Sequence, residues 1–168
     1  GAAAFQSNKI KVNDLIIKGD TVLDRLAFKF VDLTNLKFEG AADIGINAFD
    51  NTNVKTIDFG EKTKIIRGSA FTNTKIDMDV LKIPSSVQSI EQSAFYSNTK
   101  KINKLVIGAK TIEVQAFAGG TIKEIEFTTT ENIKDRAFLN NGTEKLKLSN
   151  NLKTIGYGAF KDNKINQN

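Results

Sequence analysis

The 168-residue sequence contains no cysteine, no histidine and no tryptophan, and it has a single proline. Without cysteine or histidine the chain can form no disulfide bond, no reactive thiol and no zinc site of the Cys/His type. Histidine is also the usual acid–base catalyst near neutral pH, and it is missing. These absences exclude thiol redox chemistry and leave few routes to catalysis.

Long apolar runs and signal-peptide patterns are absent as well. No stretch of about 18 apolar residues occurs, so the sequence predicts no direct membrane insertion. Lysine and arginine number 24 and acidic residues 19, which gives a net charge of +5. Both signs are mixed along the chain, and such mixing is typical of a solvated surface and unlike a nucleic-acid-binding arm.

The sequence does contain a repeated dipeptide. Ala-Phe occurs eight times, and successive copies lie 21 to 24 residues apart. A period of this length is typical of a solenoid, in which each repeat forms one coil stacked on the previous coil. The phenylalanines of the eight pairs are Phe5, Phe28, Phe49, Phe71, Phe95, Phe117, Phe138 and Phe160.

Residues 72–95 show the pattern within one coil most clearly. Positions 81–83 alternate apolar, polar and apolar, which predicts a strand with one buried face, and Pro84 ends it. Ile90 precedes Ala94 by four residues, a spacing that predicts one face of a short helical turn. The inward strand pairs expected in the seven coils are Leu15/Ile17, Leu36/Phe38, Ile57/Phe59, Leu81/Ile83, Leu105/Ile107, Ile125/Phe127 and Leu146/Leu148.

A further aliphatic position lies three residues before most of these strands, and Met78 fills it in the coil 72–95. A single coil cannot bury so many apolar side chains, because their partners lie in the neighbouring coils. Full burial of one large apolar side chain contributes roughly 1.5–3 kcal/mol before entropy is subtracted. We therefore expect the phenylalanines to form an interior stacked column and not an exposed platform for nucleic-acid bases.

The segment 81–95, LKIPSSVQSIEQSAF, resembles the BspA-type leucine-rich repeat of bacterial and some protist surface proteins. That repeat follows the pattern L-x-I-P-x-x-V-x-x-I-x-x-x-A-F, and the other six units match it more loosely. The resemblance covers essentially residues 4–168, although only Pro84 retains the proline. Where the family often has a cysteine, this chain has asparagine in four units, at Asn8, Asn98, Asn141 and Asn163.

Repeat period and resemblance together predict an α/β-type leucine-rich-repeat solenoid that is mostly β. We expect about seven stacked coils of 21–24 residues, a parallel sheet on the concave face, and short helical turns or short strands on the convex side. Residues 1–168 are expected to form one domain that is a piece of a longer protein. The expected repeats are approximately 6–28, 29–49, 50–71, 72–95, 96–117, 118–138 and 139–160.

The resemblance implies a non-catalytic protein that is secreted or displayed at a cell surface, since the family shares no catalytic residues. We expect a protein-recognition or adhesion module, with no cofactor and no metal site. Its partner would be a protein, such as a host extracellular-matrix or plasma protein or another cell-surface protein. The alternative is a structural spacer that projects another domain from the surface. Nucleic acid is not expected as a partner, because Asp58, Glu124 and Glu126 interrupt the candidate basic stripe.

The candidate protein-binding patch lies on the concave face. Residues between the inward positions of a strand point away from the core. Val80 and Val106 form a small apolar spot there, with Lys82 and Lys104 beside it. The alternative interpretation is a solvated ladder of opposite charges, in which each cross-strand pair contributes roughly 0.2–1 kcal/mol.

The remaining motifs predict turns. Neither Gly119-Gly120 nor Gly156-Tyr157-Gly158 matches a phosphate-binding loop. Asn141-Gly142-Thr143 has the form of an N-glycosylation sequon, and a turn is the alternative interpretation.

Overall fold

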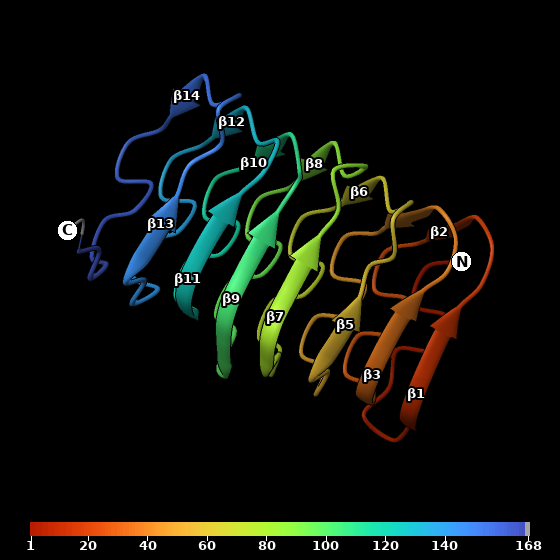
Figure 1. Cartoon of the computed structure of the whole chain (residues 1–168). Coiled ribbons are helices and arrows are strands. Elements are labelled where there is room, and N and C mark those ends of the chain that lie inside the picture. The colour runs from red at the N-terminus through yellow and green to blue at the C-terminus, as the bar shows by residue number, and fades with distance from the viewer. Residues whose placement is uncertain (167–168) are drawn as a thin grey trace.

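The computed structural model describes residues 1–166 as a stack of coils with two rows of parallel strands (Figure 1). The front row contains β1 (Lys11–Ile17), β3 (Asp32–Phe38), β5 (Thr56–Asp58), β7 (Met78–Ile83), β9 (Lys101–Ile107), β11 (Thr121–Phe127) and β13 (Lys145–Lys147). The rear row contains β2 (Thr21–Leu23), β4 (Ala42–Ile44), β6 (Ile65–Ile66), β8 (Ser89–Ile90), β10 (Thr111–Ile112), β12 (Asn132–Ile133) and β14 (Thr154–Ile155). The predicted solenoid of about seven coils is confirmed.

The rear side consists of short strands, and residues 1–166 contain no helix. The prediction of a helical turn between Ile90 and Ala94 is therefore wrong, although both side chains are buried as expected. Ile90 ends β8, and Ser93 then adopts a φ of 57°, in the left-handed region. A left-handed residue at this point prevents a right-handed helix from forming. The seven rear strands pair in chain order into one continuous sheet.

Each Ala-Phe pair links its coil to the next by a short hydrogen bond. The backbone N–H of the phenylalanine donates to the carbonyl of the alanine in the following coil, as Phe71 does to Ala94. All seven such bonds measure 2.7 or 2.8 Å between nitrogen and oxygen. Seven of the eight alanines are buried, and the exception is Ala4 in the first turn. A small side chain is needed here, because the backbones of adjacent turns are in direct contact.

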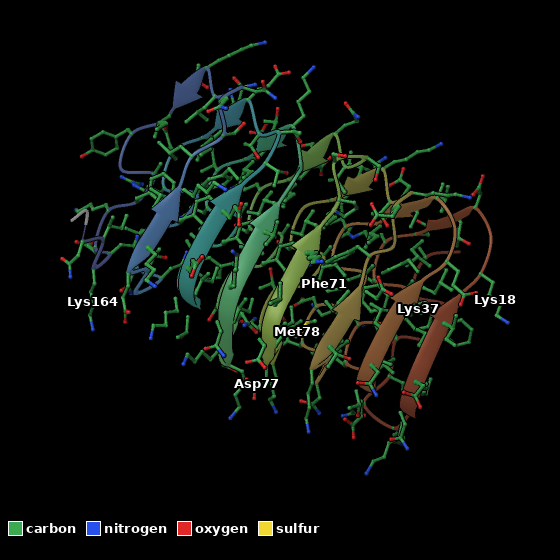
Figure 2. The ribbon with its side chains drawn as sticks, in the orientation of Figure 1. Lys18, Lys37, Phe71, Asp77, Met78 and Lys164 are labelled. Atoms are coloured by element: carbon green, nitrogen blue, oxygen red, sulfur yellow. The ribbon has the colours of Figure 1, made fainter. Side chains whose placement is uncertain are left out.

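The eight phenylalanine rings form the predicted column. Successive ring centroids lie 4.8–5.3 Å apart, and the planes are inclined by no more than 12°. Three further rings, those of Phe38, Phe59 and Phe127, meet the column edge-on from the front strands. Aromatic pairs of both kinds contribute about 0.5–1.5 kcal/mol beyond the area that they bury. The column is thus the centre of the core, and Figure 2 shows Phe71 between the two rows of strands.

Two residues of almost every Ala-Phe turn have a left-handed backbone. One precedes the alanine: Ala3, Leu26, Asn47, Ser69, Ser93, Gln115, Arg136 and Gly158. The other lies two residues after the phenylalanine: Phe30, Asn51, Asn73, Ser97, Gly119, Asn140 and Asp162. Asparagine, serine and glycine predominate, and asparagine and glycine are the residues that adopt this region most readily. Leu26 and Phe30 are bulky exceptions in one turn.

The front strands form two sheets, β1–β3–β5 and β7–β9–β11–β13, where a single sheet was expected. Glu39, Gly108 and Thr128 each follow a front strand and donate their N–H to the carbonyl that ends the preceding front strand. Pro84 has the equivalent place after β7 and carries no N–H to donate. The same bond is missing at Gly60, although β3 and β5 pair, so the proline alone does not account for the break, which lies between β5 and β7.

Met78 occupies the break. Its sulfur accepts a hydrogen bond from the backbone N–H of Ile57 in β5, at 3.4 Å. The buried position that Val54 has in the preceding coil belongs to Ile76, which is fully buried, whereas Met78 is half-buried. Toward the next coil Met78 lies beside Ile102 and packs against the core, as predicted, while Ile76 takes the place of Val54. The two extra residues between Phe71 and Leu81, compared with Phe49 to Ile57, allow Ile76 to take it.

Removing one ring from the column should destabilise the protein strongly. Phe95 is buried and stacks on Phe71 and Phe117. We expect Phe95→Ala to lower the free energy of unfolding in urea by about 3–5 kcal/mol, through lost burial and the cavity left behind. The neighbouring Tyr96 is 41% exposed, and Tyr96→Ala should change stability by no more than about 0.5 kcal/mol. Equal effects of the two variants would contradict a structural role for the column.

Phe30 is 43% exposed and has a φ of 65°. Phe30→Asn should raise the free energy of unfolding by roughly 0.5–1 kcal/mol, because relief of the left-handed strain exceeds the lost contact with the Lys29 ammonium. The reciprocal variant Asn140→Phe, at the equivalent place, should lower it by a similar amount. Urea unfolding of both variants checks the prediction, which fails if they shift stability in the same direction.

Candidate functional site

Two rows of side chains point outward from the front strands, and we call this surface the front face. It corresponds to the predicted concave face. The lower row contains Asp14, Asn35, Thr56, Val80, Lys104, Glu124 and Lys145, and the upper row Ile16, Lys37, Asp58, Lys82, Val106, Glu126 and Lys147. Figure 2 shows Lys37 on β3 within the upper row. The parallel register gives each row one residue per coil.

The structure brings the four predicted patch residues together. Val80 of β7 lies beside Lys104 of β9, and Lys82 lies beside Val106. Val80 and Lys82 are exposed, whereas Lys104 and Val106 are half-buried. Each valine therefore has a lysine as its neighbour on the adjacent strand. The four form one contiguous surface, and its role in binding stays a prediction.

Lys104 belongs to an ion-pair network as well as to the patch. Its ammonium lies 2.7 Å from a carboxylate oxygen of Glu126 and 3.2 Å from one of Glu124. Lys147 approaches the other oxygen of Glu126, also at 2.7 Å. Hydrogen bonds with Glu126 and then Glu124 raise the pKa of Lys104, and those from Lys104 and Lys147 lower the pKa of Glu126 to about 2. The alternative interpretation, a ladder of opposite charges, therefore applies to the side of the patch that contains Lys104. Lys82, on the other side, is exposed.

A hollow of about 330 Å³ lies on the front face across β1, β3 and β5. One wall is a fixed polar ladder, in which Asn35 donates to Asp14 at 2.8 Å and Thr56 donates to Asn35 at 2.6 Å. The hollow is lined by Asp14, Leu15, Ile16, Asn35, Leu36, Lys37, Thr56, Ile57, Asp58 and Met78. Sequence reasoning did not identify this hollow. A sequence feature that could have indicated the hollow is the position of the chain's single methionine, Met78, close to its single proline, Pro84.

A second hollow of about 270 Å³ lies on the other side of the break, where the front strands end. Lys82, Pro84 and Val106 contribute to its lining, so it adjoins the predicted patch. Asp58 lines both hollows. The patch, the two hollows and the break between β5 and β7 are therefore neighbours on one surface.

Asn141 does not offer a glycosylation site in the folded chain. Its side chain is 1% exposed, and its amide oxygen accepts a hydrogen bond from the N–H of Gly120 at 2.9 Å. The amide nitrogen, to which an oligosaccharide would be attached, is buried as well, so the folded chain gives no access to it. Residues 141–143 lie between the turn that ends at Asn140 and β13, so the prediction of a turn at 141–143 is not confirmed.

Six copies of a family model described as "BspA type Leucine rich repeat region" match the chain over residues 21–142 and 96–168. The chain belongs to the BspA-type leucine-rich repeat family. Leucine-rich repeats generally mediate protein–protein interaction and are typically non-catalytic, and the BspA type is often associated with surfaces. No curated protein and no solved structure matches the chain.

Three of the four asparagines at the family's cysteine position, Asn98, Asn141 and Asn163, join coils of this BspA-type solenoid by hydrogen bonds. Asn98 accepts from the N–H of Ile76 at 2.8 Å and donates to the carbonyl of the same residue at 2.9 Å. Asn163 accepts from the N–H of Thr143 and donates to the carbonyl of Phe138. A buried amide here satisfies backbone groups that would otherwise lack partners.

Residues 1–166 include no helix long and apolar enough to span a bilayer.

The Glu126 network should make stability depend on acid pH. The folded pKa of Glu126, about 2, lies below the ordinary value of 4.5, so its contribution is present above about pH 4.5 and lost as the pH falls toward 2. Between these values the urea midpoint of the wild-type protein should fall more steeply than that of Glu126→Gln. Glu61→Gln, at an exposed acid, is the control and should follow the wild type. Parallel curves for wild type and Glu126→Gln would exclude this contribution.

Proposed function

We propose that this chain is a non-catalytic protein-recognition or adhesion module that acts at a cell surface or in the extracellular space and binds a protein partner through its front face. Its membership in the BspA-type family supports the general role. The observation that carries the choice of surface is that the two front hollows adjoin the predicted patch and the break between β5 and β7, whereas two further hollows within residues 1–166 adjoin neither row of the front face. The rear sheet, by contrast, is continuous across the same coils.

The chemistry of this surface suits a protein ligand. Ile16 and Val80 are 48% and 41% exposed, and Met78 lies between them at the end of the first hollow. Exposed apolar side chains surrounded by polar groups are typical of interaction sites, and methionine adapts its shape to a partner. Asn35 and Thr56 are held by hydrogen bonds before any partner arrives. Fixed polar groups of this kind reduce the entropy lost on binding.

Binding to a panel of immobilised extracellular-matrix, plasma and bacterial surface proteins tests the proposal. The double variant Val80→Glu/Val106→Glu should weaken binding to any ligand found by at least about tenfold, because it places two charges in the centre of the patch. The control Val22→Glu/Ile46→Glu alters two exposed apolar residues outside the front face and should bind like the wild type. Circular dichroism confirms that each variant keeps its fold.

The reverse result, with the control losing binding and the front-face variant retaining it, would place the site outside the front face. Absence of binding to every protein of the panel would favour the alternative, a structural spacer.

One structural feature supports the spacer alternative directly. The unbroken column of eight rings, together with the continuous rear sheet, is suited to a stiff rod.

A further inference from the structure

Charge is distributed unevenly between the two edges of the front sheets. All front strands run in the same direction, so they begin at one edge and end at the other (Figure 1). We call the segments at the starts of the front strands, together with 163–166 at the equivalent place in the last turn, the entry edge: 8–13, 31–34, 52–55, 74–79, 98–103, 120–123, 141–144 and 163–166. The segments that follow those strands form the exit edge: 18–22, 39–43, 60–64, 84–88, 108–112, 128–132 and 149–153.

The entry edge is basic and the exit edge is neutral. The entry edge carries eight lysines, all exposed, and four acidic residues; the lysines are Lys9, Lys11, Lys55, Lys75, Lys100, Lys101, Lys123 and Lys164. Its acidic residues are Asp32, Asp77, Asp79 and Glu144. The exit edge carries five lysines and five acidic residues. Most of the net charge of +5 is therefore concentrated along one edge.

Few entry-edge lysines are neutralised within the molecule. Lys123 lies 3.6 Å from Glu144, and within the part of the chain that the structure describes the other seven lysines form no ion pair. Two of the acidic residues are already hydrogen-bonded, since Asp32 accepts from Asn53 and Asp79 accepts from Asn103. At the exit edge, by contrast, Lys110 and Lys153 both contact Glu131.

The lysines are distributed over successive coils along this edge, and segments 31–34 and 141–144 contain none. Neighbouring strands of a sheet are about 4.8 Å apart, so residues of successive coils follow one another along the edge at about this interval, over a total length of roughly 30 Å. Figure 2 shows Asp77 and Lys164 along the edge where the front strands begin, and Lys18 at the opposite edge. The lysine-rich part runs from Lys75 to Lys164.

We propose that the entry edge binds a linear sulfated polysaccharide. A row of unpaired ammonium groups gains affinity for a polyanion mainly by releasing its counterions. Lysine offers a point charge without the planar fork of arginine, and none of the three arginines (Arg25, Arg67 and Arg136) lies on this edge. Sulfate groups spaced along a flexible chain require only such charges in a row.

Two other polyanions fit the edge less well. A DNA duplex winds around its axis, so each backbone leaves a straight row of lysines after a few phosphates. Single strands require exposed aromatic side chains for stacking, and the entry-edge segments contain no aromatic residue. The entry-edge lysines lie outside the two rows of the front face and line neither front hollow, so the inference does not depend on the proposed protein partner.

Heparin is a suitable probe, with binding to the whole chain measured by calorimetry at several salt concentrations. The variant Lys75→Gln/Lys100→Gln/Lys101→Gln should weaken binding by roughly 100-fold at low salt. It should also reduce the slope of log K against log salt by about 2 to 3. The matched control is Lys18→Gln/Lys62→Gln/Lys64→Gln, which lowers the net charge equally at exposed exit-edge positions and should bind within about threefold of the wild type.

Each other outcome overturns the proposal. Equal losses in the two variants would mean that net charge alone attracts heparin. Failure of the wild type to bind heparin at about 0.15 M salt, or equal binding of desulfated heparin, would exclude a sulfated polysaccharide. Tighter binding to duplex DNA or to phosphatidylserine vesicles, with the same loss in the entry-edge variant, would identify one of those as the ligand. The entry-edge variant should bind the protein panel unchanged, which keeps this test separate from that of the front face.

Discussion

The hydrogen bond from each Ala-Phe turn to the next is the constraint on which the rest of the structure depends. At 2.7–2.8 Å it sets the rise of one coil on another, and the ring spacing of 4.8–5.3 Å follows from the same rise. Alanine is required because the turn backbones touch, and the left-handed residues on either side allow the chain to turn so tightly. Strand pairing in the front and rear rows then occurs at a separation that the turns have already fixed.

The front face is the part of the solenoid where this regularity is interrupted. Pro84 removes one backbone donor, and the sulfur of Met78 takes a place beside Ile57 where a regular ladder would continue. Both hollows adjoin this point, and Asp58 lines each of them. With Pro84 and Met78 at the break, the otherwise repetitive front face has one place that differs from all others. A specific partner requires such a place in order to bind at a defined position. The basic entry edge has the opposite character, since its charge is spread over several coils, mainly from Lys75 to Lys164.

The Ala-Phe period was sufficient to predict the solenoid and the ring column, and the alternation within each coil predicted the inward strand positions, because stacking requires the same residue type at the same place in every coil. Leu148 is an exception, since it is 41% exposed and lies outside β13. Departures from the period were harder to foresee. The burial of Ile76 in addition to Met78 depends on how two extra residues are accommodated, and the break between β5 and β7 depends on hydrogen bonds between different coils. The register brought Val80, Lys82, Lys104 and Val106 together as expected. The neutralisation of Lys104 by Glu126 depends on side-chain geometry, which no spacing rule supplies.

The break in the front sheets also has a mechanical consequence, because the rear sheet is not interrupted. Between β6 and β8 the rear strands remain paired, whereas the facing strands β5 and β7 are joined by the bond from Asp77 to Lys55 and by the contact with Met78. A force that opens the front of the stack at this junction meets less resistance than one that opens the rear. The solenoid therefore has one preferred bending axis, located between its third and fourth coils, and deflection about it changes the width of the front face while the rear sheet acts as the pivot.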